Sequence, residues 1–244
     1  MSRWPIMAYS VTVYAIFFAT FLYLIAFVGD LPFAPLTVNR GGGFGPVATA
    51  VGVDLTLIAL FGLQHSGMAR RGFKRWLTGF VPAAVERSTY VLAASVMLML
   101  MFVLWRPIPA FLWSADGVAA VLLWGLFALG WGIVLLSTFL INHFELFGLQ
   151  QAWFNLRARD ASDPIFRTPL LYKLVRHPIY LGFFIAFWSV PTMTAGGLLF
   201  AGGMSLFMLV GIQLEERDLI ALFGERYHRY RREAGMLLPR LRRG

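Results

Sequence analysis

The stretch YKLVRHPIYLG, residues 172–182, places an arginine, a histidine and a proline directly before an apolar run. Proline favours the first turn of a helix, and the residue before a proline is driven out of helical geometry. We therefore expect His177 to precede a helix that begins at Pro178. The N–H groups at the start of that helix, and the positive end of its dipole, would face the polar segment before it.

The chain around this stretch is dominated by apolar residues. Of its 244 residues, 59% are hydrophobic and 14% are charged, and none is cysteine. Several apolar runs approach the ~20 residues that a helix needs to cross a bilayer. The predicted fold class is all-α: a polytopic integral membrane helical bundle of about six transmembrane helices, forming a single domain over residues 1–244. The expected spans are residues 7–28, 47–63, 88–105, 117–141, 179–195 and 196–214.

The basic residues orient these spans. With the N-terminus in the cytoplasm, 19 of the 21 Lys and Arg residues fall on the cytoplasmic side, and only Arg40 and Arg106 lie outside. Positive charge gathers on the cytoplasmic side of membrane proteins, so both termini are predicted to be cytoplasmic. The first apolar run follows Arg3 and lacks a cleavage site, which favours a retained helix over a cleaved signal peptide.

The net charge of +9 admits two interpretations, nucleic-acid binding or contact with anionic lipid. In a polytopic protein, basic loops facing the lipid surface account for such a charge. We therefore expect the lipid bilayer, and no nucleic acid, as a partner. The absence of cysteine excludes disulfides, thiolate zinc sites and a cysteine nucleophile.

The last two expected spans form a tight hairpin that turns near residues 194–197. Each arm is ~23–27 Å long at 1.5 Å per residue, so Arg176 and His177 return to the membrane depth of Glu215 and Glu216. Two segments far apart in the sequence then meet, and two interpretations fit them. An ion pair pins the hairpin, or the two charges form a site for a zwitterionic ligand.

The Arg-His-Pro stretch and the Glu-Glu stretch, with the residues that follow them, together resemble the C-terminal signature of the membrane methyltransferases that act on isoprenylated cysteine or on phospholipid amines. The chain carries that signature as Arg176, His177, Pro178, Tyr180, Gly182, Glu215, Glu216, Phe223, Gly224, Tyr227 and Tyr230. The resemblance implies that S-adenosyl-L-methionine binds under a cytoplasmic cap, residues 142–178 and 215–244, and leaves as S-adenosyl-L-homocysteine. The implied cofactor contacts are Arg176, His177, Tyr180, Leu181, Gly182, Glu215 and Glu216.

Further stretches narrow the resemblance to the bacterial methanethiol S-methyltransferases, which implies a location in the bacterial inner membrane. They are FGLQHSGMARRGFKRW (61–76), VERSTYVL (85–92), INHFELFGLQQAW (141–153) and FWSVPTMTAGGLLFA (187–201). The resemblance implies methylation of a small volatile thiol, methanethiol, to dimethyl sulfide. It leaves open a lipid amine or a larger thiol as acceptor. Outside methyl transfer, it leaves open a membrane reductase and a non-catalytic membrane assembly factor.

Methylation of a thiol needs a proton acceptor, because the thiolate is the nucleophile and alkyl thiols are largely protonated at neutral pH. His65 ends the second expected span and His143 follows the fourth, both at the cytoplasmic level. They are the candidate bases; for each, the alternative is an interfacial histidine bonded to backbone. Glu86, Arg87 and Glu145 share that level and are supporting catalytic candidates.

Asp54 is an ionisable residue inside the second expected span, eleven positions before His65 and on the same helix face. It either lines the path of the thiol or bonds a neighbouring helix. No metal site is predicted, because His65, His143 and Glu145 match no compact ligand motif. The sequence indicates no oligomeric state.

Overall fold

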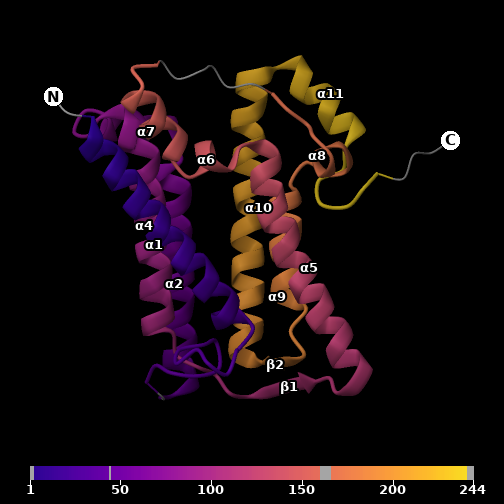
Figure 1. The fold of residues 1–244 in the computed structure, drawn as a ribbon. Helices are drawn as coiled ribbons and strands as arrows, with labels where there is room; N and C mark the ends of the chain where they lie inside the picture. Colours follow the sequence, from indigo (N-terminus) through magenta and orange to yellow (C-terminus); the bar gives the residue numbers. More distant parts are fainter. Residues whose placement is uncertain (1–2, 44, 160–165, 241–244) are drawn as a thin grey trace. The chain divides into compact units, whose positions relative to one another are not determined.

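The computed structural model describes residues 3–43, 45–159 and 166–240, most of them in helices (Figure 1). Within this described part, five helices are long and apolar enough to cross a membrane. They are α1 (Trp4–Val28), α2 (Val47–Met68), α4 (Ala83–Leu104), α5 (Gly117–Ile141) and α10 (Ala195–Phe223). The chain is therefore a multi-pass membrane protein, and the predicted all-α membrane bundle is confirmed.

Shorter elements connect the long helices. They are α3 (Arg71–Leu77), β1 (Phe111–Ser114), α6 (His143–Leu146), α7 (Leu149–Leu156), α8 (Leu171–Leu174), α9 (Pro178–Trp188), β2 (Thr192–Thr194) and α11 (Glu225–Glu233). β1 and β2 pair into a two-stranded sheet. The helix predicted to begin at Pro178 is α9, with His177 as its N-cap residue.

The helix expected over residues 179–195 is shorter than predicted. α9 has 11 residues, which is ~16 Å of helix, and the chain then continues into β2. Pro191 explains the end of the helix, because proline disfavours helical geometry in the residue before it and cannot donate a backbone hydrogen bond.

The last long helix is longer than predicted and carries the Glu-Glu pair on its cytoplasmic extension. α10 runs to Phe223, nine residues beyond the expected end at residue 214. No glycine or proline interrupts the chain between Gly211 and Gly224, so nothing breaks the helix earlier. Gly224 adopts a positive φ of 52°, which glycine tolerates best, and α11 starts at the next residue.

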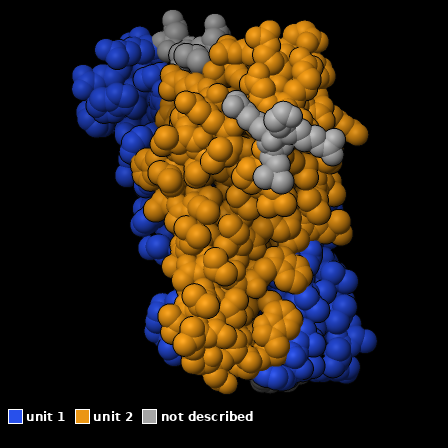
Figure 2. All heavy atoms as spheres, turned by 90° about the vertical axis from the view of Figure 1, so that its right-hand side faces the viewer, with its two compact units in different colours: residues 1–112, 143–163, 194–203 blue, residues 113–142, 164–193, 204–244 orange. Residues whose placement is uncertain are grey.

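The chain divides into two compact units, coloured separately in Figure 2. Unit 1 comprises residues 1–112, 143–163 and 194–203, and unit 2 comprises residues 113–142, 164–193 and 204–244. The single membrane domain over residues 1–244 stays a prediction.

Unit 1 is built on α1, α2 and α4, with α7 packed against α1 and α4. Its core is aromatic: the ring of Phe27 lies 4.9 Å from that of Phe102 and 5.7 Å from that of Phe200. A buried hydrogen bond of 2.8 Å from Ser88 Oγ to Ser10 Oγ joins α4 to α1. The Phe27–Phe102 contact and the Ser88–Ser10 bond hold α4, the helix that carries Arg87, against α1.

Unit 2 is built on the pair α5 and α9, which pack very closely. A Cβ atom on Gly130 would lie 2.7 Å from the carbonyl oxygen of Gly182, and one on Gly182 would lie 2.6 Å from the carbonyl oxygen of Gly130. Small residues allow two helix backbones to approach in this way. At the start of α9, Val175 pairs with Gly235, so the segment after α11 runs beside the Arg-His-Pro stretch.

Candidate functional site

The Arg-His-Pro segment meets the Glu-Glu pair at the start of α9. Arg176 Nε lies 2.7 Å from Glu216 Oε1, and His177 Nε2 lies 3.2 Å from the same oxygen. Arg231 Nε, from α11, lies 3.1 Å from Glu216 Oε2. The predicted meeting of these segments is therefore observed, and the ion pair that pins them is formed by Glu216.

The C-terminal segment holds Arg176 in place. Arg176 Nη1 donates to the carbonyl oxygens of Ala234, at 2.6 Å, and Arg231, at 3.3 Å. The backbone N–H of Arg176 donates to Gly235 O at 2.8 Å. With 7% of the Arg176 side chain and 6% of the Glu216 side chain exposed, this is a buried ion pair whose polar atoms are well supplied with hydrogen bonds, as such pairs require.

The two neighbouring glutamates differ sharply. Glu216 is surrounded by Arg176, His177 and Arg231, whereas 46% of the Glu215 side chain is exposed. Glu215 Oε2 lies 3.9 Å from His177 Nδ1. Successive residues of a helix point about 100° apart, so one carboxylate enters the ion-pair cluster and the other remains accessible.

The remaining predicted cofactor contacts lie on the first two turns of α9. The ring of Tyr180 lies 5.7 Å from that of His177 in an edge-on arrangement, and the N–H of Leu181 donates to His177 O at 3.0 Å. Both side chains are half-buried, but Gly182 is buried against Gly130 of α5. Helix packing accounts for the glycine at position 182, and its cofactor contact stays a prediction.

Two tyrosines of α11 complete the cluster. The hydroxyl of Tyr230 donates to the carbonyl oxygen of Tyr172, next to the Arg-His-Pro segment. Tyr227 is 1% exposed, and within the described residues its hydroxyl has no hydrogen-bond partner. Burial raises the pKa of Tyr227 and of Tyr230, so both hydroxyls stay protonated.

The sequence analysis assigned no individual role to Tyr227, Tyr230 or Arg231. A signal for the tyrosines was present, because a Tyr-x-x-Tyr spacing places both side chains on one face of a helix. For Arg231 the sequence holds no comparable signal, since eight arginines lie between residue 217 and the end of the chain. Only the fold of α11 against α10 distinguishes this arginine from its neighbours.

The candidate base His143 belongs to unit 1 and is buried among aromatic rings. Its Nε2 lies 2.8 Å from the hydroxyl of Tyr14, and its ring lies 4.8 Å from that of Phe147. Burial lowers the pKa of His143 below its ordinary value, so the ring is neutral at pH 7. A neutral imidazole is the form that accepts a proton.

The candidate base His65, in the same unit, also bonds a tyrosine. Its Nε2 lies 2.8 Å from the hydroxyl of Tyr90, and its ring stacks on Phe61 at 5.3 Å. The Arg87 guanidinium lies 4.9 Å from the centre of the Tyr90 ring and donates from Nε to Leu146 O at 2.7 Å. The structure thus brings His65 and Arg87 onto the same tyrosine.

The other two supporting candidates of unit 1 are the glutamates Glu86 and Glu145. Glu86 is half-buried in the first turn of α4, and Glu145 is exposed in α6. The catalytic roles of all five unit 1 residues stay predictions. Within the described part of the chain, no three His, Asp or Glu side chains gather closely enough to hold a metal ion.

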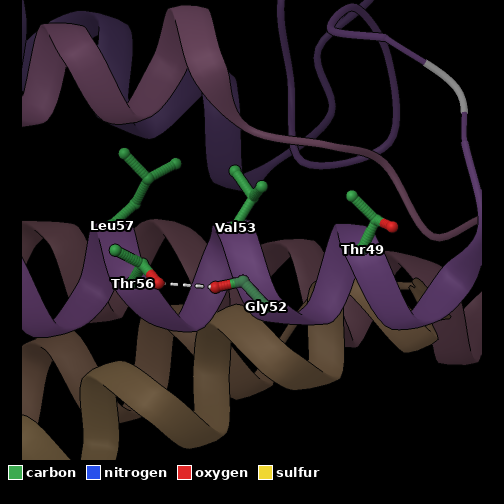
Figure 3. Close-up of a pocket in the computed structure, with 5 residues that line it drawn as sticks. All are labelled: Thr49, Gly52, Val53, Thr56 and Leu57. Carbon is green, nitrogen blue, oxygen red and sulfur yellow. Dashed lines mark hydrogen bonds between the residues drawn. The ribbon is translucent and has the colours of Figure 1, made fainter.

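Asp54 is fully buried in α2 and bonds another part of unit 1. Its Oδ1 accepts the backbone N–H of Arg106 at 2.9 Å, where the chain leaves α4. This bond is of the kind expected if Asp54 joins neighbouring helices. Another face of α2 lines a cavity of about 400 Å³ (Figure 3). The lining residues are Thr49, Gly52, Val53, Thr56 and Leu57, none of them titratable, so the cavity lacks the chemistry of the predicted site.

Comparison with known proteins adds independent information. The chain is 51% identical over 240 residues to a methanethiol S-methyltransferase of Mycobacterium tuberculosis, covering 98% of each chain. It is 51% identical over 233 residues to a methanethiol S-methyltransferase of a Pseudomonas species, covering 95% of this chain and 89% of the relative. A nurim of Xenopus laevis is 28% identical over 195 residues, 75% of this chain and 67% of the relative.

No family model matches the sequence, and no solved structure matches it. The relatives named methanethiol S-methyltransferase nevertheless align over nearly the whole chain at about half identity. Such similarity includes both the Arg-His-Pro segment and the Glu-Glu pair within the aligned length. The chain belongs to the methanethiol S-methyltransferase family.

Proposed function

We propose that the protein transfers the methyl group of S-adenosyl-L-methionine to methanethiol, with dimethyl sulfide and S-adenosyl-L-homocysteine as products. The names of its relatives support both methyl transfer as the reaction and methanethiol as the acceptor. One observation supports placing the cofactor here: the accessible carboxylate of Glu215 lies beside the buried cluster of Arg176, His177 and Glu216.

The polar groups of unit 2 fit the charges of this cofactor. Glu215 offers a carboxylate for an ammonium group or for ribose hydroxyls. Arg231, with 41% of its side chain exposed, offers a guanidinium that can bind the carboxylate of the cofactor. The positive end of the α9 dipole favours a carboxylate as well. When bound, the cofactor supplies a methyl group on a sulfonium, which is an electrophilic carbon.

We assign different roles to the two glutamates. Arg176 and His177 direct side-chain nitrogens at Glu216, and all three side chains are nearly buried. They are positioning residues: they fix the start of α9 against α10 and so fix the place of Glu215. Glu215, Tyr180 and Leu181 retain enough exposure for direct contact with the cofactor.

The thiol must lose its proton before or during the transfer. Its sulfur then forms a bond to the methyl carbon as the carbon–sulfonium bond breaks, and the proton passes to a base. We keep His65 and His143 as the proposed acceptors. Since Nε2 of each ring is bonded to a tyrosine hydroxyl, the proton enters at Nδ1 or through that hydroxyl.

We also propose that the protein lies in a bacterial inner membrane with both termini in the cytoplasm. The charge asymmetry between the two sides supports this orientation. The segments predicted to form the cap, residues 142–178 and 215–244, then lie on the cytoplasmic side, and we propose that a small apolar thiol reaches the protein from the bilayer.

The decisive assay uses the purified protein, labelled S-adenosyl-L-methionine and methanethiol, with gas chromatography of volatile dimethyl sulfide. We expect labelled product only when both substrates are present. Cofactor binding without dimethyl sulfide would reject methanethiol as the acceptor, and a lipid amine or larger thiol would then be tested in the same assay.

The site assignment is tested by cofactor affinity. We expect Glu215→Gln to weaken the binding of S-adenosyl-L-homocysteine about 10- to 100-fold, the loss typical of a hydrogen bond to a charged group. The matched control is Glu233→Gln, an exposed glutamate at the end of α11. Equal affinity in both variants, measured by titration calorimetry, would contradict the placement of the cofactor.

A further inference from the structure

The hydroxyl of Tyr227 is a buried polar group that the fold leaves without a partner. The residue is 1% exposed, and no hydrogen bond to its hydroxyl is found in the described part of the chain. Its ring is held by the rings of Tyr230, at 5.9 Å, and Phe166, at 6.1 Å. Most buried polar atoms of native proteins have partners, so an exception calls for an explanation.

The charges around this hydroxyl are those of the ion-pair cluster. Burial is the main cause that raises the pKa of Tyr227; Glu216 and Glu215 add to the rise, and Arg176 opposes it. Tyr227 lies on α11, the helix whose Arg231 Nε is 3.1 Å from Glu216 Oε2, so the helix that carries the hydroxyl is bonded to the ion-pair cluster. The hydroxyl is protonated and able to donate.

Tyr230 provides the contrast. It lies one helical turn further along α11 in the same aromatic cluster, and its hydroxyl donates to the carbonyl oxygen of Tyr172. The hydroxyl of Tyr230 stabilises the fold, which explains a tyrosine at that position. Fold stability does not explain a tyrosine at position 227, because phenylalanine would fill the same space without burying a donor that has no hydrogen bond.

We propose that Tyr227 is a cofactor-binding residue, whose hydroxyl donates a hydrogen bond to an acceptor atom of bound S-adenosyl-L-methionine beside Glu215. This assignment rests on the proposed function. The apo protein then carries the cost of an unpaired donor, and binding of the cofactor removes it.

The test compares Tyr227→Phe with Tyr230→Phe in the purified, detergent-solubilised full chain. Two quantities are measured: the unfolding midpoint without ligand, and the dissociation constant of S-adenosyl-L-homocysteine by calorimetry. We expect Tyr227→Phe to leave the midpoint unchanged or higher and to weaken binding about three- to tenfold, the effect of one neutral hydrogen bond. We expect Tyr230→Phe to lower the midpoint and to bind within about twofold of the wild type.

The outcomes separate this assignment from the proposed function. If the wild type binds and Tyr227→Phe binds equally well, the role of Tyr227 is overturned and the cofactor site stands. If Tyr227→Phe lowers the midpoint as much as Tyr230→Phe and does not change affinity, the hydroxyl is structural and the assignment is overturned. If the wild type does not bind, the proposed function fails and the role of Tyr227 fails with it.

Discussion

Glu215 and Glu216 are adjacent and chemically identical, yet the fold gives them opposite environments. Glu216 is buried in contact with Arg176, His177 and Arg231, and Glu215 is half exposed beside His177. A carboxylate already paired on both oxygens is a poor ligand for a new cation. We therefore expect the accessible carboxylate of Glu215 to bind the ligand and the buried carboxylate of Glu216 to stabilise the fold.

We predict that Glu216→Gln destabilises the protein strongly and that Glu215→Gln does not. Loss of the Glu216 charge leaves the Arg176 guanidinium buried without its counter-charge, which costs about 3–5 kcal/mol. The Glu215 change, at an exposed position, should fall within about 0.5 kcal/mol. Chemical unfolding in detergent measures both, and comparable losses in the two variants would contradict the difference in environment.

We predict that His143 makes stability fall in mildly acidic solution. Because burial lowers the pKa of His143 below 6.5, the unfolded chain takes up a proton at this residue before the folded protein does. Stability is therefore complete above pH 6.5 and declines as the pH falls below it. Unfolding midpoints at about pH 7.5 and about pH 5.5 should differ more for the wild type than for His143→Gln. An equal difference would mean that His143 is solvated.

At the scale of elements, the close approach of α5 and α9 determines where the Arg-His-Pro segment lies within unit 2. The approach depends on two glycines, Gly130 and Gly182, that sit against each other's backbones. A sequence pattern for cofactor binding and a packing requirement therefore coincide at position 182. Loss of activity on substitution of Gly182 would not by itself identify a cofactor contact.

We predict that Gly130→Ala separates α5 from α9 and destabilises the protein by about 1–3 kcal/mol, the usual cost of overpacking. The control is Gly132→Ala on the same helix, because a Cβ atom there meets nothing within 4 Å. Alanine's higher helix propensity should leave that variant unchanged or more stable, by up to about 1 kcal/mol. Unfolding curves that coincide for the two variants would contradict the packing argument.

At the scale of the whole molecule, the distribution of charge and the apolar helices together predict how the chain sits in a membrane. Nineteen of 21 basic residues fall on one side of the predicted topology. The bilayer interior excludes such side chains, and anionic lipid at the cytoplasmic surface attracts them.

Because the chain has no cysteine, a single introduced thiol reports its own location. We predict that Ser114→Cys, in β1, reacts with a membrane-impermeant maleimide in intact bacterial cells. Thr78→Cys, after α3, and Glu225→Cys, at the start of α11, should react only after lysis. All three positions are exposed in the structure. Labelling of Glu225→Cys from outside would overturn the proposed orientation of the C-terminal cap.

The sequence by itself determined the class of fold, most of the long helices and the meeting of the Arg-His-Pro segment with the Glu-Glu pair. Apolar run length and proline position are local properties, and they suffice for the fold class, the long helices and the start of α9. The meeting was predicted from two full helical arms, and the structure reaches it with a shorter α9 followed by β2. The local properties failed at the span over residues 179–195, where the apolar run continues past the end of the helix at Trp188. Hydropathy alone does not register that Pro191 forces an extended backbone.

Only the tertiary structure decided which polar groups of the cluster are satisfied. The environments of Glu215 and Glu216, the contact of Arg231 and the unpartnered hydroxyl of Tyr227 within the described residues depend on how α11 folds back against α10. Hydrogen bonds and burial are properties of distances between residues remote in the chain. A sequence identifies the candidate residues. Only their packing determines which of them are already paired and which remain available to a ligand.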